Sequence, residues 1–583
     1  MKMKKYIYPV CLAMGLTAAS CSLDEFPQAS ITPETFFKTE NDLRLYTNSF
    51  YNAFPGASTF YTENVDITTG REIPEIVRGA YVIPTTGGGW DWSQLRNINF
   101  YLERSLQCDD ETARNRWDAV ARFFRAFFYY GMVAKFGDVP YYDRVLGDDD
   151  EGLTAPRDSR VLVTEKMIED LDFAILHLPS AANVEEVTKW TALALKSRIC
   201  LFEGTWRKYH RKYALEGADE LLQLAAEAAG QIMTQGPYTL HVSANGKSQS
   251  YMELFNQDDI VTDEVILARR YSAALQVFHD ANYSLLSSSS DIIGLEKAFV
   301  NSYLMKDGSR FTEEPGYEEM EFVEECKNRD PRLAQTIRTP GYTREGTRMA
   351  PSLYTSMTGY TIHKYLSGSH NDANTKDESD IPLFRLGEVL LNYAEAKAEL
   401  GTLTQDDIDK TVNALRDRVG MTGKLNLAEA NLNPDKYLEE NFYPGVSGSY
   451  KGVILEIRRE RAIELVQEGF RWNDMCRWKA GSTFTRTYKG MYFPGTGTFD
   501  LDGDNIDDLC IYTGDKPEKG DIQYKKLGTD IFLENGEQGG CMLINSHWVK
   551  TWDEERDYLY PIPIQERLLN PNLTQNNGWD DGI

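Results

Sequence analysis

The chain has 583 residues, of which 42% are hydrophobic, 26% charged and 12% aromatic, and its formal charge at pH 7 is −27. These proportions are ordinary for a globular protein. The acidic balance argues against nucleic acid and anionic lipid as partners, since both are negatively charged, whereas neutral sugars remain compatible ligands.

The first segment has the pattern of an export signal. Lysines precede an apolar stretch over residues 6–19, which is too short to span a bilayer. The sequence Ala18-Ala19-Ser20-Cys21 then forms a lipobox, with Ala18 where Leu is usual. We predict that residues 1–20 are a lipoprotein signal peptide and that Cys21 carries the lipid. The alternative is an ordinary signal peptide that is cleaved nearby.

Cleavage would remove three lysines and no acidic residue, so the charge would change from −27 to about −30. No later run approaches the length of about 18 apolar residues that a membrane-spanning helix needs. The acyl chains on Cys21 would then be the only attachment to the outer-membrane lipid.

Helical periodicity recurs along the chain, and the clearest case is Thr112–Phe136, which Gly137 ends. The same periodicity predicts helices at Val161–Leu178, Trp190–Phe202, Asp219–Met233, Leu383–Leu400, Thr411–Val419 and Val453–Gln467. Small residues at many contact positions are typical of paired-helix repeats. The segment Glu264–Ala268 resembles a short buried strand.

Long irregular stretches separate the helices, at residues 59–89, 272–290, 367–379 and 482–540. Loops of this length inside a compact body usually carry function. No linker divides the chain, so we expect residues 21–583 to form a single integrated α-rich body.

Charged residues line one side of the predicted helix at 453–467, namely Arg458, Arg461, Glu464 and Glu468. Opposite charges at helical spacing favour a structural ion-pair ladder over a catalytic set of carboxylates.

An acidic loop follows near the C-terminus, with Asp500, Asp502 and Asp504 at alternate positions and Asp508 four residues later. This spacing is similar to calcium loops, in which alternate side chains surround a hard cation. Asn505 stands where such loops usually have Gly, and Asn tolerates a left-handed backbone. We expect a structural Ca²⁺ site here, the alternative being a solvated acidic turn.

Six cysteines remain beyond Cys11 and Cys21, and no two of them form a C-x-x-C pair. Their scatter makes a zinc site improbable and selects none of the 15 possible disulfide pairings. We favour buried free thiols.

A family resemblance emerges from short phrases that follow one another along the chain. They are Cys21–Pro27, Trp92–Asn99, Arg122–Tyr130, Phe136–Pro140, Asn328–Leu333, Asn392–Ala396, Leu415–Gly420, Arg458–Glu464, Gly469–Arg471, Asp474–Trp478, Tyr560–Pro563, Asn570–Leu573 and Gln575-Asn576. In this order they resemble the RagB/SusD family. The acidic pair Asp24-Glu25 also resembles the surface-export signal of the bacteria that carry such proteins.

The resemblance implies a mostly α SusD-like fold, with four tetratricopeptide-like helix pairs as the scaffold and an irregular face of loops and short strands. It divides the mature chain into an N-terminal part, about residues 21–260, and a C-terminal RagB/SusD part, about 261–583. It implies no required cofactor. The implied role is that of a cell-surface lipoprotein of the outer membrane, which captures a glycan and passes it to a SusC-like TonB-dependent transporter.

Glycan capture needs aromatic faces and groups that pair with hydroxyls. By resemblance these come from two loops, which here contribute Arg71, Arg78, Tyr81, Trp90 and Asp91 from the first, and Tyr271, Phe278 and Tyr283 from the second. For each residue taken singly, packing under its loop is the alternative. Glycines precede Trp90 and make its exposure more plausible, whereas we interpret Trp92, Trp472 and Trp478 as core residues.

Nothing in the sequence marks an enzyme. The G-x-S-x-G, P-loop and H-E-x-x-H motifs are missing from the sequence, and the seven His are isolated from one another. We therefore expect a binding protein. The alternatives are capture of peptides by the same scaffold or, less favoured, a surface glycoside hydrolase.

Overall fold

The computed structural model describes residues 36–580 and 582. The predicted signal peptide, Cys21 and the acidic residues that follow it lie outside this range. Within the described residues, no helix is both long enough and apolar enough to cross a membrane.

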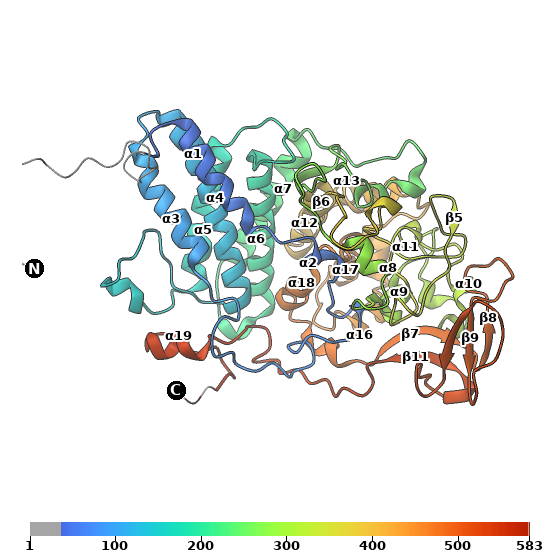
Figure 1. The fold of residues 1–583 in the computed structure, drawn as a ribbon. Coiled ribbons are helices and arrows are strands. Elements are labelled where there is room, and N and C mark those ends of the chain that lie inside the picture. Colours follow the sequence, from blue (N-terminus) through green and yellow to red (C-terminus); the bar gives the residue numbers. More distant parts are fainter. Residues whose placement is uncertain (1–35, 581, 583) are drawn as a thin grey trace, which may run out of the picture.

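Long helices form one end of the molecule (Figure 1). They are α1 (Glu40–Thr47), α3 (Ser93–Arg104), α4 (Glu111–Phe136), α5 (Arg160–His177), α6 (Lys189–Tyr209) and α7 (Ala218–Gln235). Helix α4 packs along α5, and α6 packs along α7, so the predicted paired-helix scaffold is confirmed. The Asp110 side chain caps α4 by accepting a hydrogen bond from the Ala113 N–H, and Gly137, at φ 74°, ends it.

The C-terminal part continues the scaffold with shorter helices. They are α12 (Leu386–Glu399), α13 (Gln405–Lys410), α14 (Val412–Arg418), α15 (Leu427–Leu432), α16 (Lys436–Asn441), α17 (Lys451–Glu464) and α18 (Arg471–Arg477). Helix α12 packs on α7, α17 and α14, which joins the two parts. The remaining short helices are α2 (Ser58–Tyr61), α8 (Ala281–Leu286), α9 (Lys297–Ser302), α10 (Phe322–Glu325), α11 (Pro331–Ala334) and α19 (Ile564–Leu569).

Small sheets complete the irregular face. The predicted strand at 264–268 is β2 (Val265–Arg269), and it pairs antiparallel with β6 (Ile381–Arg385). Strand β7 (Tyr488–Phe493) pairs with β11 (Gly540–Ile544), and β8 (Gly497–Phe499), β9 (Leu509–Tyr512) and β10 (Gln523–Lys526) form a three-stranded sheet. Two-residue strands make the pairs β1 (Thr68–Thr69) with β3 (Gly294–Leu295) and β4 (Thr343–Arg344) with β5 (Thr347–Arg348).

Three predicted helix boundaries are wrong, and the first is that of the helix predicted over Val453–Gln467, which spans Lys451–Glu464. The helix predicted to begin at Leu383 begins at Leu386, because residues 381–385 pair with β2 as a strand. The helix predicted to end at Phe202 continues to Tyr209, where Arg207 and Arg160 share the buried Glu203 carboxylate at 2.9 and 2.6 Å. At residues 381–385 the strand partner overrides the local pattern, and at Glu203 the contact with Arg160 of another helix supports the longer α6.

The predicted charge ladder is structural, as expected, but it does not run along one helix. Arg458 pairs with Glu399 of α12 at 3.1 Å, and Arg461 pairs with Asp474 of α18 at 2.8 Å. Glu464 contacts three arginines from other elements. These side chains are buried, and their ion pairs connect different helices and strands instead of lying on a solvent-exposed helix face.

The six cysteines in the described residues, Cys108, Cys200, Cys326, Cys476, Cys510 and Cys541, are all free, and five of them are buried. This confirms the preference for free thiols. Burial raises the pKa of the Cys200 thiol to about 12, which makes it a poor nucleophile.

Candidate ligand-binding site

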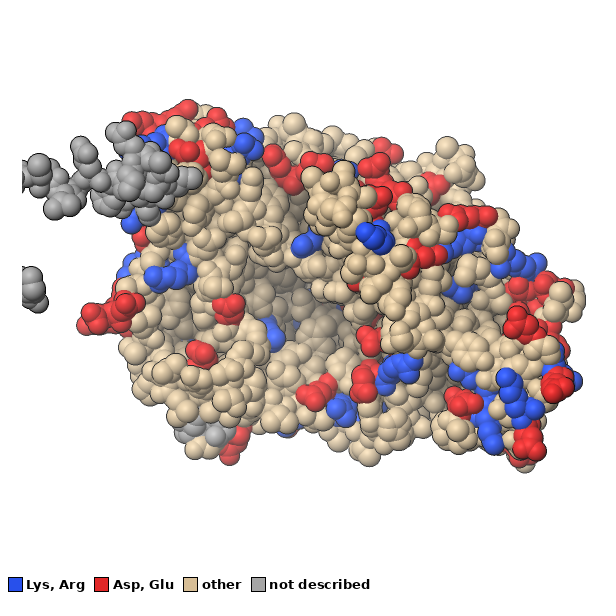
Figure 2. All heavy atoms as spheres, in the orientation of Figure 1, with Lys and Arg blue, Asp and Glu red and all other residues tan. Residues whose placement is uncertain are grey.

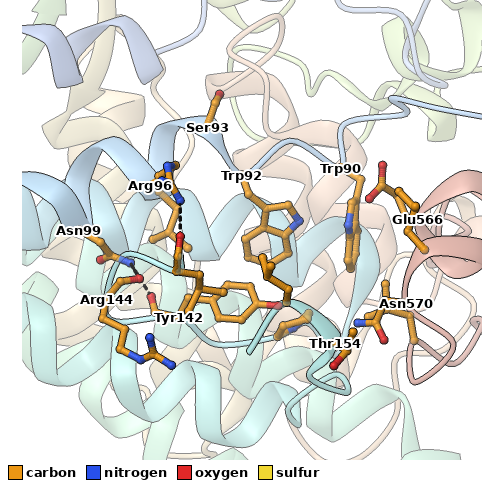
Figure 3. A pocket seen from close by; sticks show the side chains of 16 residues that line it. Trp90, Trp92, Ser93, Arg96, Asn99, Tyr142, Arg144, Thr154, Glu566 and Asn570 are labelled. Carbon is orange, nitrogen blue, oxygen red and sulfur yellow. Dashed lines mark hydrogen bonds between the residues drawn. The ribbon is translucent and has the colours of Figure 1, made fainter. Parts of the chain in front are cut away.

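A cavity of about 500 Å³ opens at the helical end of the molecule (Figure 3). Three segments form it: the start of α3, the loop that follows α4, and the C-terminal helix α19 with the residues after it. Its wall is mainly apolar, with Trp90, Trp92 and Tyr142 beside several leucines. Ligand pockets of this size and character are common in proteins.

The two tryptophans are held by rings around them. Trp90 lies edge-on to Phe136, with ring centroids 5.0 Å apart, and to Trp92, at 5.3 Å. Trp92 also lies edge-on to Tyr142, at 5.4 Å. These contacts fix an aromatic wall before any ligand arrives.

The glycines before Trp90 do not expose it as the sequence suggested. They adopt positive φ and turn the chain, so that the Trp90 N–H donates to the Gly87 carbonyl at 2.9 Å. A Cβ at Gly89 would come within 2.8 Å of the Lys135 ammonium nitrogen. Trp90 is therefore 7% exposed, and that small exposed fraction lies on the cavity wall. Trp92, expected to serve only the core, lines the same cavity.

Polar side chains at the cavity hold its loop in place. Arg96 donates to the Leu146 carbonyl at 2.7 Å, and the Asn99 amide donates to the Tyr142 carbonyl at 2.9 Å. Both bonds are drawn in Figure 3. Across the cavity, the Asn570 amide donates to the Ala155 carbonyl at 2.8 Å, and burial raises the pKa of Glu566. The site thus combines fixed aromatic rings with polar groups at its edges.

The other residues predicted in the first loop lie away from this cavity. Arg71 donates to the carbonyls of Ser290 and Ser288, at 2.9 and 2.5 Å. Arg78 lies 4.7 Å from the centroid of the Trp548 ring. Tyr81 packs edge-on against Tyr560 and Trp579.

Asp91 follows Trp90 directly and is exposed. Its carboxylate accepts from the Ser93 N–H at 2.9 Å at the start of α3, so its observed contact is structural.

The predicted residues of the second loop are also dispersed. Tyr271 is 8% exposed, its hydroxyl accepts from the Ala57 N–H, and it lines a different cavity of about 460 Å³. Phe278 is half-buried, with the Lys376 ammonium 4.8 Å from its ring centroid. Tyr283, on α8, is 38% exposed. Of the eight nominated residues, the structure brings only Trp90 to the wall of the 500 Å³ cavity, which we call the tryptophan cavity.

Sequence reasoning missed Tyr142, Arg96 and the wall from α19. The aromatic pair at residues 141–142, directly after Pro140, was the one available signal. The remainder had none, because the cavity joins segments more than 400 residues apart, as the Asn570–Ala155 bond shows.

The acidic loop is compact. Asp500, Asp502 and Asp504 each offer an oxygen, and these oxygens lie within 4.8 Å of one another. Asp508 is not part of this group, and one of its oxygens accepts from the N–H groups of Leu501 and Asp502 at 2.8 and 3.2 Å. Asn505 has φ 67°, the left-handed conformation expected for it. Calcium binding itself remains a prediction.

Comparisons with known proteins show which sequence family the chain matches. A sequence model of the SusD family matches residues 263–579, and a second, described as starch-binding and associating with the outer membrane, matches residues 81–202. The chain is 24% identical to SusD-like protein P2 of Formosa agariphila, over 99% of both chains. It is 22% identical to a SusD-like protein of Bacteroides ovatus, over 97% of this chain and 96% of the other.

Solved structures show the same fold. A SusD-like carbohydrate binding protein from Bacteroides fragilis superposes with a TM-score of 0.69 at 21% identity, covering 93% of this chain and all of the other. A second SusD-like protein from Bacteroides fragilis gives 0.68 at 20% identity, over 94% of this chain and 98% of the other. The predicted fold is confirmed, and the chain belongs to the SusD family.

Proposed function

We propose that this chain is a carbohydrate-binding protein that captures an oligosaccharide or polysaccharide in the tryptophan cavity. The observation that carries the proposal is the preformed wall of Trp90, Trp92 and Tyr142. Sugar rings present C–H faces that pack on aromatic rings, and their hydroxyls pair with polar groups at the rim. A relative of the same fold is itself described as carbohydrate binding, which supports this ligand class.

The cavity is better suited to binding than to hydrolysis. Glycoside hydrolases use two carboxyl groups on either side of the scissile bond. Among the described residues, Glu566 is the one carboxylate on the cavity wall. A lone carboxyl group can pair with a hydroxyl but cannot supply both the acid and the nucleophile or base.

We further propose that the bound glycan is delivered to a SusC-like TonB-dependent transporter, and that lipid on Cys21 holds the protein at the cell surface. The lipobox and the family membership support this role. The surface charge is compatible with it: on the face shown in Figure 2, basic side chains are dispersed among acidic ones and form no continuous basic area of the kind that nucleic acid requires.

The test is affinity electrophoresis of residues 22–583 through gels that contain a panel of polysaccharides. We expect one polysaccharide to retard the protein, and Trp90→Ala and Trp92→Ala each to abolish most of the retardation. Tyr283→Ala, on the exposed face of α8, is the matched aromatic control. Thermal unfolding of each variant shows whether a loss of binding comes from the missing aromatic side chain or from unfolding of the protein.

If both tryptophan variants fold and are still retarded, the protein binds the polysaccharide but the tryptophan cavity is not the binding site. Retardation by no polysaccharide would shift the proposal towards peptides. In the second arm, capture of a large outer-membrane protein by the lipidated chain would support delivery to a transporter.

A further inference from the structure

A second cavity, of about 640 Å³, opens where α9, α16 and the β7–β11 pair meet. In Figure 1 these elements lie to the right of centre, whereas α3 and α19 of the tryptophan cavity lie at the left. Tyr317, Tyr437 and Tyr492 line this cavity together with several charged side chains. It is a separate site, and its chemistry differs from that of the first.

The cations in its wall are already neutralised. They form the pairs Lys297–Glu325 at 2.8 Å, Arg486–Glu296 at 3.3 Å and Lys489–Glu534 at 2.5 Å. Three further lining carboxylates, Glu318, Glu319 and Glu440, are exposed and have no salt-bridge partner in the described chain. The cavity therefore carries negative charge that the protein leaves uncompensated.

These carboxylates lie close to the aromatic rings. Burial, and then the charges of Glu318 and Glu440, raise the pKa of Tyr317 to about 12. Burial, and then Glu319, raise the pKa of Tyr492. Tyr317 lies edge-on to Tyr437, with ring centroids 6.4 Å apart. Ring faces beside negative charge are the usual surroundings of a bound organic cation.

A buried acceptor on the same wall lacks a donor. Asn301 is 6% exposed, and its Oδ1 atom has no hydrogen-bond partner among the described residues. The Tyr437 hydroxyl also interacts with the Asn301 side chain, but it donates its own proton to the Ala298 carbonyl at 3.1 Å and so leaves the Oδ1 atom without a donor. A buried polar atom without a partner destabilises the folded chain, because its hydrogen bond to water is lost and not replaced. A ligand that brings hydrogen-bond donors into the cavity would remove that cost.

We propose that this cavity binds a cationic group, either a protonated primary amine or a guanidinium. Such groups donate hydrogen bonds and accept none. They therefore match a wall made of carboxylates, tyrosine rings and the Asn301 carbonyl oxygen. The shared chemistry has two sources, the amine of an amino sugar and the side chain of Lys or Arg in a peptide. The proposal rests on this cavity alone and is independent of glycan capture by the tryptophans.

Calorimetric titration of residues 22–583 tests it with charged and neutral probe pairs. The sugar pair is the tetramer of glucosamine and the tetramer of N-acetylglucosamine, and the peptide pair is trilysine and triglycine, both N-acetylated and C-amidated so that the lysine side chains carry the charge. We expect at least one cationic probe to bind with a stoichiometry of one, more weakly as salt is raised, and its neutral counterpart not to bind. The cationic probe that binds identifies the source. Binding by neither cationic probe, or equal binding by the neutral counterparts, would overturn the proposal.

Variants then locate the site. Replacing Glu319 and Glu440 together by Gln should weaken the cationic probe at least tenfold. The control replaces Glu220 and Glu227, exposed on α7, by Gln and makes the same change in net charge. Equal weakening in both double variants would show that the probe is attracted only by the overall negative charge of the protein, and would reject the site. Undiminished binding in the Glu319 and Glu440 double variant would also reject it. Trp90→Ala should leave cation binding intact, which separates failure of this proposal from failure of glycan capture.

Discussion

The helices α1 to α7 pack around aromatic rings, whereas the interior of the C-terminal part is crossed by guanidinium groups. In the first region Phe124 is fully buried, with ring centroids of Tyr51 and Phe54 at 5.0 and 5.1 Å. Its buried ion pairs include Arg125–Asp170, at 2.7 Å, which joins the consecutive helices α4 and α5. Long amphipathic helices can bury enough apolar surface to hold themselves together.

The second region relies on branched charge networks. Arg385, at the end of β6, contacts Glu264 at 3.0 Å and Glu464 at 2.8 Å. Arg418, at the end of α14, contacts the same two carboxylates at 3.1 and 2.7 Å. Glu264 and Arg418 are 154 residues apart in sequence. Short helices and loops offer little continuous apolar surface, so side chains with several hydrogen-bonding atoms hold these segments in register.

The largest effect is expected from breaking this network. Glu464→Gln would leave Arg332, Arg385 and Arg418 without their shared counter-charge in a dry interior. Removing one partner of a buried ion pair costs about 3–5 kcal/mol. We expect a loss of that size in the free energy of unfolding, measured with denaturant. Asp406→Asn, in the exposed pair with Lys410, is the control and should change stability little. A small loss for Glu464→Gln would show that packing, not charge, holds this region.

Acid should unfold the second region first. Burial opposes ionisation of Glu464 and Glu395, but contacts with arginines outweigh it, so that the pKa of Glu464 lies well below its usual range and that of Glu395 falls to about 2. Both groups are therefore ionised in the folded chain at pH values where the unfolded chain takes up protons. Their contribution to stability is present above about pH 4.5 and is lost as the pH falls towards 2.

We expect a loss of about 2 kcal/mol between pH 4 and pH 3, since each such group contributes up to about 1.4 kcal/mol per pH unit. Amide hydrogen exchange should show opening of α14 and α17 before that of α4 and α5. Simultaneous loss of protection in all four helices would contradict a difference between the two regions.

The smallest effect concerns the acidic loop at the edge of the second region. We propose that Ca²⁺ binds to Asp500, Asp502 and Asp504, because Asp502 is 5% exposed and its Oδ1 atom has no hydrogen-bond partner among the described residues. Arg348 holds its other oxygen at 2.7 Å. We expect millimolar Ca²⁺ to raise the melting temperature by about 1–3 °C, as for a weak extracellular site. Combined replacement of Asp500 and Asp504 by Asn should abolish the shift, whereas an equal shift with Mg²⁺ would argue for general screening.

The family, the helical scaffold and the positions of most of the longer helices could be predicted from the sequence alone. Periodicity located α4, α5 and α7 to within a few residues, because the buried residues of an amphipathic helix recur every three or four positions in the sequence. The family resemblance also nominated Trp90, which lines the candidate cavity. The same local rules failed at residues 381–385, where a strand partner more than 110 residues away decided the conformation.

The positions of the cavities and the pairing of the buried charges could not be predicted from the sequence. Tyr142 and Asn570 join Trp90 because the chain folds back, and no spacing in the sequence encodes that approach. The arginine network likewise depends on segments that are distant along the chain and adjacent in space. Periodicity reports the surroundings of one element, whereas a binding site is made of side chains from several elements, and their meeting is fixed by packing of the whole chain.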